Sequence, residues 1–372
     1  MVSPEKKVKK RVFVAMSGGV DSSVAAALLK EEGYDVTGVF MKNWSDSSFF
    51  KDKTMCPWVE DQEDARKAAA VLGIPFYTFN FEKEYRDRVV KYMLDGYKKG
   101  ITPNPDVMCN KEIKFGIFFK KALELGADFV ATGHYARRRE IKNQNSKIKI
   151  HELLAGADLN KDQSYFLWTL TQKQLARTLF PIGDYAKPEV RAMAKKFGLA
   201  NAEKKDSQGL CFVGEVDVFE FLKSKIKPKR GKIMTAGGKD VGEHEGVMFY
   251  TIGQRHGIGS PGGGTAYYVA GKDIKKNILY VAEGKEDKSL YKDELTVAGA
   301  HWISGVKSRM PLKCQVRIRY RQPLQKCALI KLPTTSYKLQ AVFDEPQRAV
   351  TPGQSIVFYD GDTVLGGGVI VK

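Results

Sequence analysis

Several residue types and patterns are scarce in this sequence. Its 372 residues include only five cysteines and no Cys-x-x-Cys pair, so neither a zinc ribbon nor a clustered iron–sulfur site is expected, and no metal site is predicted. An odd number of widely spaced cysteines fits free thiols in a reducing cytoplasm. No apolar run approaches the ~18 residues of a membrane span, and the basic first ten residues lack the apolar stretch of a signal peptide. We therefore expect a cytoplasmic protein with no membrane partner.

Negative charge is also in short supply. The chain carries 61 Lys and Arg against 43 Asp and Glu, a formal net charge of +18. Its 43% hydrophobic and 28% charged content is typical of a folded globular protein, and its length allows two or three domains. Clustered cations release counterions from a phosphate backbone, so a polyanionic partner is favoured. The alternative is a solvated, lysine-rich surface that serves solubility alone.

A glycine-containing stretch near the N-terminus predicts a phosphate site. Residues 12–15 are typical of a short buried strand and residues 25–29 of a helix, and Gly18 and Gly19 lie between them. A helix N-terminus offers unpaired N–H groups, and glycines let the backbone approach an anion closely. The Walker pattern needs a lysine where Asp21 stands, which disfavours an ordinary P-loop NTPase. The stretch Ser-Gly-Gly-Val-Asp-Ser-Ser (17–23) resembles the pyrophosphate loop of ATP pyrophosphatases; a simple strand–helix joint is the alternative.

The first third of the chain alternates strand and helix patterns, which predicts a doubly wound parallel sheet. Further strands are expected at 36–41, 75–79 and 128–132, and helices at 60–72, 82–97 and 114–125. Ligands collect at the carboxyl ends of such strands. We therefore expect residues 17–23, 41–44 and 133–135 to surround one crevice.

The rest of the chain changes character gradually. Residues 141–150 predict an exposed excursion, and 162–199 a helical region with a helix starting near Pro188. A domain boundary is expected between about 214 and 230, where Gly, Lys and Pro become frequent. Beyond it, short strands predict small β domains, the last one a barrel. These strands are expected at 247–250, 266–269, 278–281, 314–320, 341–343 and 355–359.

Two loops carry candidate thiols. In residues 102–110, Asp106 and Cys109 are three residues apart, and we expect Pro103 and Pro105 to exclude regular helix and stiffen the loop. An Asx-type turn with an inert Cys is the alternative. Cys211 follows two lysines (204 and 205) and precedes a predicted helix at 216–223, and both features favour a thiolate. A structural Cys in an apolar strand is the competing interpretation.

Two other polar groups have open interpretations. His134 follows a predicted buried strand and either caps the strand end or contacts RNA. Arg317, Arg319 and Arg321 alternate along the predicted 314–320 strand and are either solvated charges or, with Tyr320 and the late Gly-Gln-Ser turn, part of a surface that grips the polyanionic partner.

Taken together, the motifs resemble those of the tRNA-specific 2-thiouridylases, in the family's order and over essentially the whole chain. One departure is Ser-Gln-Gly before Cys211, where many bacterial members have Ser-Thr-Gly. The matching segments are Met-Ser-Gly-Gly-Val-Asp-Ser-Ser (16–23), Gly-Val-Phe-Met-Lys-Asn-Trp (38–44), Pro-Asn-Pro-Asp-Val-Met-Cys-Asn-Lys-Glu-Ile-Lys-Phe (103–115), Ala-Thr-Gly-His-Tyr-Ala-Arg (131–137), Lys-Asp-Gln-Ser-Tyr-Phe-Leu (161–167), Gly-Leu-Cys-Phe-Val-Gly (209–214) and Thr-Pro-Gly-Gln-Ser (351–355).

The resemblance implies a fold and a set of residue roles. It implies an α/β ATP pyrophosphatase catalytic domain with a doubly wound parallel sheet (1–214), a small central β-rich tRNA-binding domain (215–288) and a C-terminal β-barrel that binds tRNA (289–372).

The resemblance also implies Cys109 and Cys211 as the catalytic cysteine pair and Asp106 as acid/base. ATP contacts are implied for Ala15, Met16, Ser17, Gly18, Gly19, Val20, Asp21, Ser22, Met41 and Gly133. Contacts to tRNA are implied for Asn104, Pro105, Asp106, His134, Lys161, Asp162, Gln163, Arg319, Tyr320 and Gln354. Cys56, Cys314 and Cys327 match no motif and are expected to be structural.

The implied reaction replaces the C2 oxygen of wobble uridine 34 by sulfur, in lysine, glutamate and glutamine tRNAs. ATP, with Mg²⁺ on its phosphates, would adenylate that oxygen. A persulfide on Cys211, supplied by a cysteine desulfurase or a sulfur-relay protein, would attack C2, and Cys109 would then close a Cys109–Cys211 disulfide. Sulfide released by Cys109 is an equally permitted variant. An adenylating ligase, a cluster-dependent thiolase and a non-catalytic RNA-binding protein are the alternatives.

Overall fold

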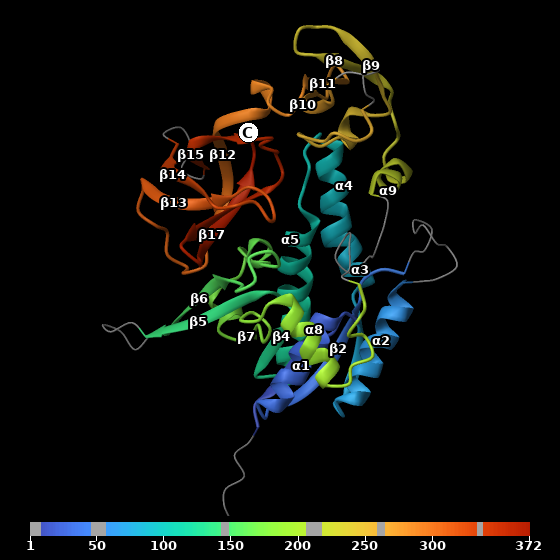
Figure 1. Ribbon diagram of the computed structural model, residues 1–372, viewed down its shortest axis with the longest axis vertical. Helices are drawn as coiled ribbons and strands as arrows, with labels where there is room; N and C mark the ends of the chain where they lie inside the picture. Colours follow the sequence, from blue (N-terminus) through green and yellow to red (C-terminus); the bar gives the residue numbers. More distant parts are fainter. Residues whose placement is uncertain (1–8, 46–56, 143–148, 206–217, 259–264, 333–337) are drawn as a thin grey trace, which may run out of the picture.

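The computed structural model describes residues 9–45, 57–142, 149–205, 218–258, 265–332 and 338–372. Figure 1 shows three parts: an α/β domain, a central β domain beyond the end of helix α4, and a C-terminal barrel beside both. Among these described residues, no helix is both long enough and apolar enough to cross a membrane.

The first domain is built on a parallel sheet with strand order β3-β2-β1-β4-β7. Alternate residues of β1 point to opposite faces: Val12 and Val14 join one apolar cluster, and Phe13 and Ala15 join another. Helices cover both faces, so the predicted doubly wound architecture is confirmed. The strands are β1 (Arg11–Ala15), β2 (Asp35–Lys42), β3 (Phe76–Asn80), β4 (Phe129–Thr132) and β7 (Thr178–Leu179). The helices are α1 (Val20–Glu31), α2 (Pro57–Val71), α3 (Glu82–Tyr85), η2 (Arg86–Val90), α4 (Lys91–Lys98), α5 (Pro105–Cys109), η3 (Asn110–Phe118), α6 (Phe119–Glu124), η4 (Ser164–Phe166), α7 (Gln172–Leu175) and α8 (Lys187–Lys196).

The prediction that residues 102–110 form a non-helical loop is wrong beyond residue 104. Helix α5 begins at Pro105, and the Asn104 side chain caps it by accepting a hydrogen bond from Val107 N at 3.1 Å. Proline suits the first helical position because its missing N–H would have no helical partner there. The helix continues through the π-helical η3 into α6, so Asp106 and Cys109 are helical residues.

One expectation for this domain agrees with its described residues, and another needs correction. The ends of the stretch 141–150, expected as an exposed excursion, belong to a hairpin of β5 (Ala136–Lys142) and β6 (Lys149–Ala155), and Ile141, Lys142 and Lys149 are exposed there. The region 162–199 is mostly short turns, and only α8 is a sustained helix there; its start beside Pro188 agrees with the prediction.

The central domain is a sheet with strand order β10-β11-β8-β9, preceded by helix α9. Residues 247–249 form the short 3₁₀ helix η5 rather than the expected strand, and Val247 and Phe249 are buried in the domain's core. The elements are α9 (Val218–Lys225), β8 (Gly231–Thr235), β9 (Asp240–His244), η5 (Val247–Phe249), β10 (Tyr267–Asp273) and β11 (Ile278–Glu283).

The C-terminal domain is a closed barrel, as predicted, because β12 pairs with both β15 and β17. Its order is β12-β15-β14-β13-β16-β17, and β6 of the first domain pairs with β17 and extends the same sheet. The strand expected to run to Tyr320 ends at Arg317, so Arg319 and Arg321 do not alternate along it; Arg321 has φ 63° and lies in a turn. The elements are η6 (Lys288–Leu290), β12 (Tyr291–Trp302), β13 (Leu312–Arg317), β14 (Gln325–Lys331), β15 (Lys338–Arg348), β16 (Ser355–Asp360) and β17 (Thr363–Ile370).

Candidate active site

The glycine loop joins β1 to α1 and is closely packed on two sides. Gly18 has φ 80°, and a Cβ on it would meet the Asp61 carbonyl oxygen at 2.2 Å. A Cβ on Gly133, which follows β4, would lie 2.6 Å from Ser22 N. Both positions therefore require glycine. The Ser22 hydroxyl accepts from Ser17 N at 3.1 Å and holds the loop closed on the first turn of α1.

The segments that were expected to surround a crevice lie close together at the carboxyl ends of the strands. Gly133 contacts Ser22, and the Tyr135 hydroxyl donates to Asp21 Oδ1 at 2.9 Å. Met41, at the end of β2, is buried in the same apolar cluster as Ala15. The N-terminus of α1 lies among these segments, and the first amides of a helix have no carbonyl partner within it. The arrangement is suited to binding an anion.

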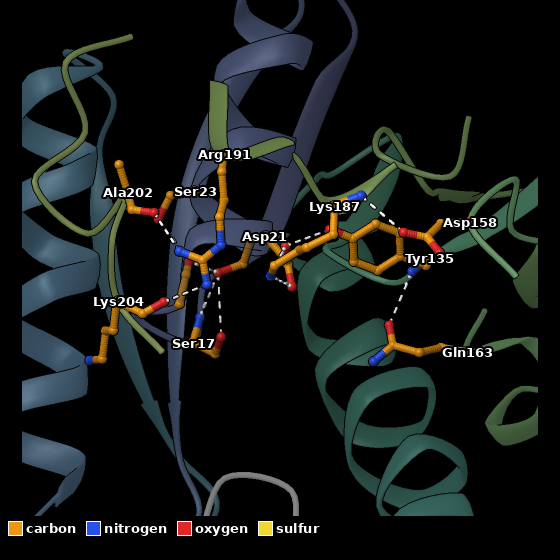
Figure 2. Close-up of polar contacts among 12 residues, drawn as sticks. Ser17, Asp21, Ser23, Tyr135, Asp158, Gln163, Lys187, Arg191, Ala202 and Lys204 are labelled. Carbon is orange, nitrogen blue, oxygen red and sulfur yellow. Dashed lines mark hydrogen bonds and ion pairs between the residues drawn. The ribbon is translucent and has the colours of Figure 1, made fainter. Parts of the chain in front are cut away.

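A lysine that sequence reasoning missed reaches the loop from α8. Lys187 Nζ lies 2.8 and 2.9 Å from the two carboxylate oxygens of Asp21, and its side chain is only 10% exposed. Its backbone N–H donates to Asp158 at 3.0 Å. Figure 2 shows Lys187 between Asp21 and Tyr135. A cation is therefore present beside the loop, although the Walker position holds Asp21. The sequence signal was limited to Pro188, which marked the start of α8 but not its place beside α1.

The segment ahead of the second cysteine loop is fastened to the same site. The Asn201 amide donates to the Gly18 carbonyl at 2.9 Å and to Ser23 Oγ at 3.0 Å. Arg191 donates to the carbonyls of Ala202 and Lys204 at 2.7 and 3.0 Å (Figure 2). The segment 201–205 is therefore anchored beside the glycine loop at Asn201.

The expectation that Lys204 favours a thiolate at Cys211 stays a prediction. The Lys204 ammonium lies 2.8 Å from an Asp61 carboxylate oxygen and 2.6 Å from an Asp64 carboxylate oxygen. Its charge is therefore compensated by two carboxylates. Cys211 itself, like Cys56, lies outside the described residues.

Helix α5 carries the acid and the first thiol. Cys109 is 0% exposed and belongs to the apolar cluster that contains Ala15 and Met41, the ends of β1 and β2. Asp106 lies in the first turn of α5, and its carbonyl accepts from the Asn110 amide at 3.1 Å. The π-helical segment η3 begins directly after Cys109, and such segments are frequent at functional sites.

The start of α5 is held by the C-terminal barrel. The Gln354 amide donates to the carbonyls of Thr102 and Pro103 at 2.8 and 3.1 Å. Asn104 Nδ2 lies 3.5 Å from Gln354 Oε1, and Thr102 N donates to the Pro352 carbonyl at 2.9 Å. Two predicted tRNA contacts, 250 residues apart, are thus brought together beside Pro105 and Asp106.

The other predicted tRNA contacts occupy less uniform positions. Asp162 is 2% exposed; it accepts from the backbone of Gly156 and Ser164 at 3.0 Å each and forms a buried ion pair with Arg317. Gln163 accepts from Tyr135 N at 3.0 Å. In this conformation both side chains hold the fold together. Lys161 is partly exposed on the turn before them.

The two barrel residues of this set lie near the domain interface. Arg319 is partly buried and donates to the Ala349 carbonyl. The Tyr320 ring lies 4.6 Å from the Phe166 ring, centroid to centroid, across the interface with the first domain.

His134 is buried rather than presented at the surface. Its side chain lies between Thr132 Oγ1 at 2.7 Å and Lys114 Nζ at 3.3 Å, and the residue is 6% exposed. Burial and the neighbouring Lys114 ammonium hold the pKa of His134 well below its usual value. This geometry favours the strand-end interpretation over stacking on a base, which would require an exposed ring.

Comparisons with known proteins extend over the whole chain. Family models match in three segments: the tRNA methyl transferase HUP domain at residues 10–215, the tRNA methyl transferase PRC-barrel domain at 219–283 and the aminomethyltransferase beta-barrel domain at 292–370. The tRNA-specific 2-thiouridylase MnmA of Geobacillus thermodenitrificans is 51% identical over 360 residues, covering 97% of this chain and 94% of that protein. The enzyme of the same name from Streptococcus mutans is 51% identical over 366 residues, 97% of this chain and 95% of that protein.

Proposed function

Because this chain belongs to the family of tRNA-specific 2-thiouridylases, we propose that it uses ATP to replace the C2 oxygen of a tRNA uridine with sulfur. The observation that carries the proposal is the meeting of two half-sites in one domain. A glycine loop suited to phosphates follows β1, and Cys109 of the helix that also carries Asp106 packs in the same apolar cluster as Ala15 and Met41 near the ends of β1 and β2. Activation of an oxygen and delivery of sulfur both need such proximity.

The glycine loop is the proposed phosphate site. The amides at the start of α1 and the backbone of Gly18, Gly19 and Gly133 would approach the phosphates, and Lys187 would offset their charge. Cleavage between the α and β phosphates would leave AMP on the uridine oxygen and make it a good leaving group. Within the described residues, no group of three or more His, Cys, Asp or Glu side chains is placed to hold a metal ion. Mg²⁺ brought with ATP would offset further phosphate charge.

The sulfur half of the reaction is assigned to the two cysteines and Asp106. The terminal sulfur of a Cys211 persulfide would bond to C2, and the C2–O bond would break with AMP as the leaving group. Cys109, as thiolate, would then attack Sγ of Cys211 and break the persulfide S–S bond, which leaves thiouridine and a Cys109–Cys211 disulfide. A thiol reductant supplies two electrons to restore the cysteines. Asp106 would move a proton at the base.

The substrate is proposed to be uridine 34 of lysine, glutamate and glutamine tRNAs in the cytoplasm. The contact between Asn104 and Gln354 supports a base site bounded by both the first domain and the barrel. The family-model ranges support the domain division 1–214, 215–288 and 289–372, with tRNA held by the second and third domains. A desulfurase or sulfur-relay protein would load Cys211.

The test is multiple-turnover thiolation with ATP, a persulfide donor and unmodified tRNA, read by nucleoside mass spectrometry. We expect 2-thiouridine with the natural chain and none above background with Cys211→Ser or Cys109→Ser. Both variants should still form AMP and pyrophosphate in the presence of tRNA. Sustained thiolation by Cys211→Ser would overturn the nucleophile assignment.

The same assay decides between this proposal and an adenylating ligase or a methyl transferase, the activity named in two of the family-model descriptions. AMP formation without thiolated nucleoside would indicate a ligase. A nucleoside heavier by a methyl group would indicate methyl transfer. The pairing of a pyrophosphate-type loop with a thiol-bearing helix favours thiolation.

A further inference from the structure

A pair of thiols lies inside the C-terminal barrel. Cys314 of β13 and Cys327 of β14 are direct register partners, and their Sγ atoms are 3.9 Å apart. Both face the barrel's own apolar cluster, whereas Cys109 belongs to a cluster of the first domain. Residues directly opposed on antiparallel strands have Cα atoms about 4.5–5.5 Å apart, a separation that a disulfide can span.

The two thiols differ in access. Cys327 is 3% exposed, and its hydrogen bond with Cys314 together with burial raises its pKa. Cys314 is partly exposed near the start of β13. A reagent from solution therefore meets Cys314 first, and Cys327 is held beside it as the second thiol. This is the arrangement of an attacking thiol and a resolving thiol.

We propose that Cys314 and Cys327 form a reversible redox site, oxidised by low-molecular-weight disulfides to a cross-strand disulfide. The Cys314 thiolate attacks one sulfur of the reagent, forms a mixed disulfide and releases one thiol. Cys327 then loses its proton and attacks Sγ of Cys314, which expels the second thiol. The two cysteines are oxidised by two electrons, and the reagent is reduced to two thiols.

The bond would join strands that lead to the domain interface. From Cys314, β13 continues to Arg317, whose ion pair with Asp162 connects the barrel to the first domain. Because the two strands are already in register, closure needs only small side-chain movements. A covalent link also restricts the unfolded chain, so the oxidised protein is more resistant to unfolding.

The test uses the full chain with Cys56, Cys109 and Cys211 replaced by serine, which leaves only this pair among the five cysteines. After treatment with oxidised glutathione, we expect a mass lower by about 2 Da, the two hydrogens lost, and no alkylation until a reductant is added. Adding Cys314→Ser should remove the mass decrease. A mixed disulfide that never closes, or two thiols that remain open to alkylation, would overturn the proposal.

Two further measurements keep the test independent of how well the serine variant folds. Peptide mapping of the oxidised natural chain should recover the peptides of residues 314 and 327 joined and released by reductant. The Tm of that protein should rise on oxidation relative to the Cys314→Ser protein treated in the same way. Failure to recover the joined peptide, or a lower Tm on oxidation, would refute a site built to close without distortion.

Discussion

The two halves of the site are held in different ways. Among the described residues, the contacts of the glycine loop come from its own domain: Lys187 and Tyr135 to Asp21, and Asn201 to Gly18. The start of α5 is held by other domains. Gln354 and Pro352 of the barrel bind it, and Thr251 Oγ1 of the central domain lies 3.3 Å from Thr102 Oγ1. Among the described residues, the proposed phosphate half therefore depends on the first domain alone. The base half needs all three domains in place.

The largest expected effect comes from breaking the buried ion pair between domains. Arg317→Met leaves the Asp162 carboxylate, which is 0% exposed, without its cation, and we expect a loss of about 3–5 kcal/mol in the free energy of unfolding. Denaturant titration measures it. The matched control is Asp362→Ala, which removes the more exposed pair with Arg137 at 2.8 Å between the same two domains and should cost less than about 1 kcal/mol. Equal losses would contradict the distinction between the two pairs.

Lys187→Met should slow AMP formation without changing tRNA binding. Removal of the cation beside the loop is expected to slow AMP formation about 100-fold while the Kd for tRNA stays unchanged. Lys195→Met on the same helix, whose partner Glu203 is exposed, serves as the control and should leave both quantities near the natural values. If Lys187→Met weakened tRNA binding as much as it slowed AMP formation, the prediction would be wrong.

Gln354→Leu should give the smallest effect and the opposite profile. It removes the two hydrogen bonds to Thr102 and Pro103. We expect tRNA affinity to fall by about 1–2 kcal/mol because the segment before α5 loses its support. AMP formation at saturating tRNA should change little. Gln340→Leu on the barrel exterior is the control. Filter-binding titrations measure the tRNA affinity, and AMP release is measured separately. Unchanged affinity together with slow AMP formation would contradict the prediction.

What could be predicted from the sequence was local or periodic. The glycine loop is one continuous stretch, so its chemistry is visible in order, and the alternating elements of the first domain predict its sheet. Lys187 could not be found in this way, because its importance depends on α8 packing beside α1. The helix at Pro105 was missed because proline was weighed as a breaker, although at the first helical position it favours the helix.

The arginines after β13 show a second limit. An alternating pattern predicted one long strand, but a turn at Arg321 and the docking of Arg317 on Asp162 end it early. Tertiary contacts, and not the local residue pattern, therefore determine where this strand ends. Likewise, His134 could be placed in the interior only once Lys114 and Thr132 were seen around it.

The pairing of β6 with β17 has a consequence for how the protein is made. Leu154 of an early hairpin pairs with Thr363, and Arg137 reaches Asp362, 225 residues further along the chain. During synthesis the hairpin therefore leaves the ribosome long before its neighbouring strand exists, with an unpaired strand edge open to other chains. The final strand closes both the barrel and that edge. Truncated or stalled chains should thus be the ones that aggregate or recruit chaperones.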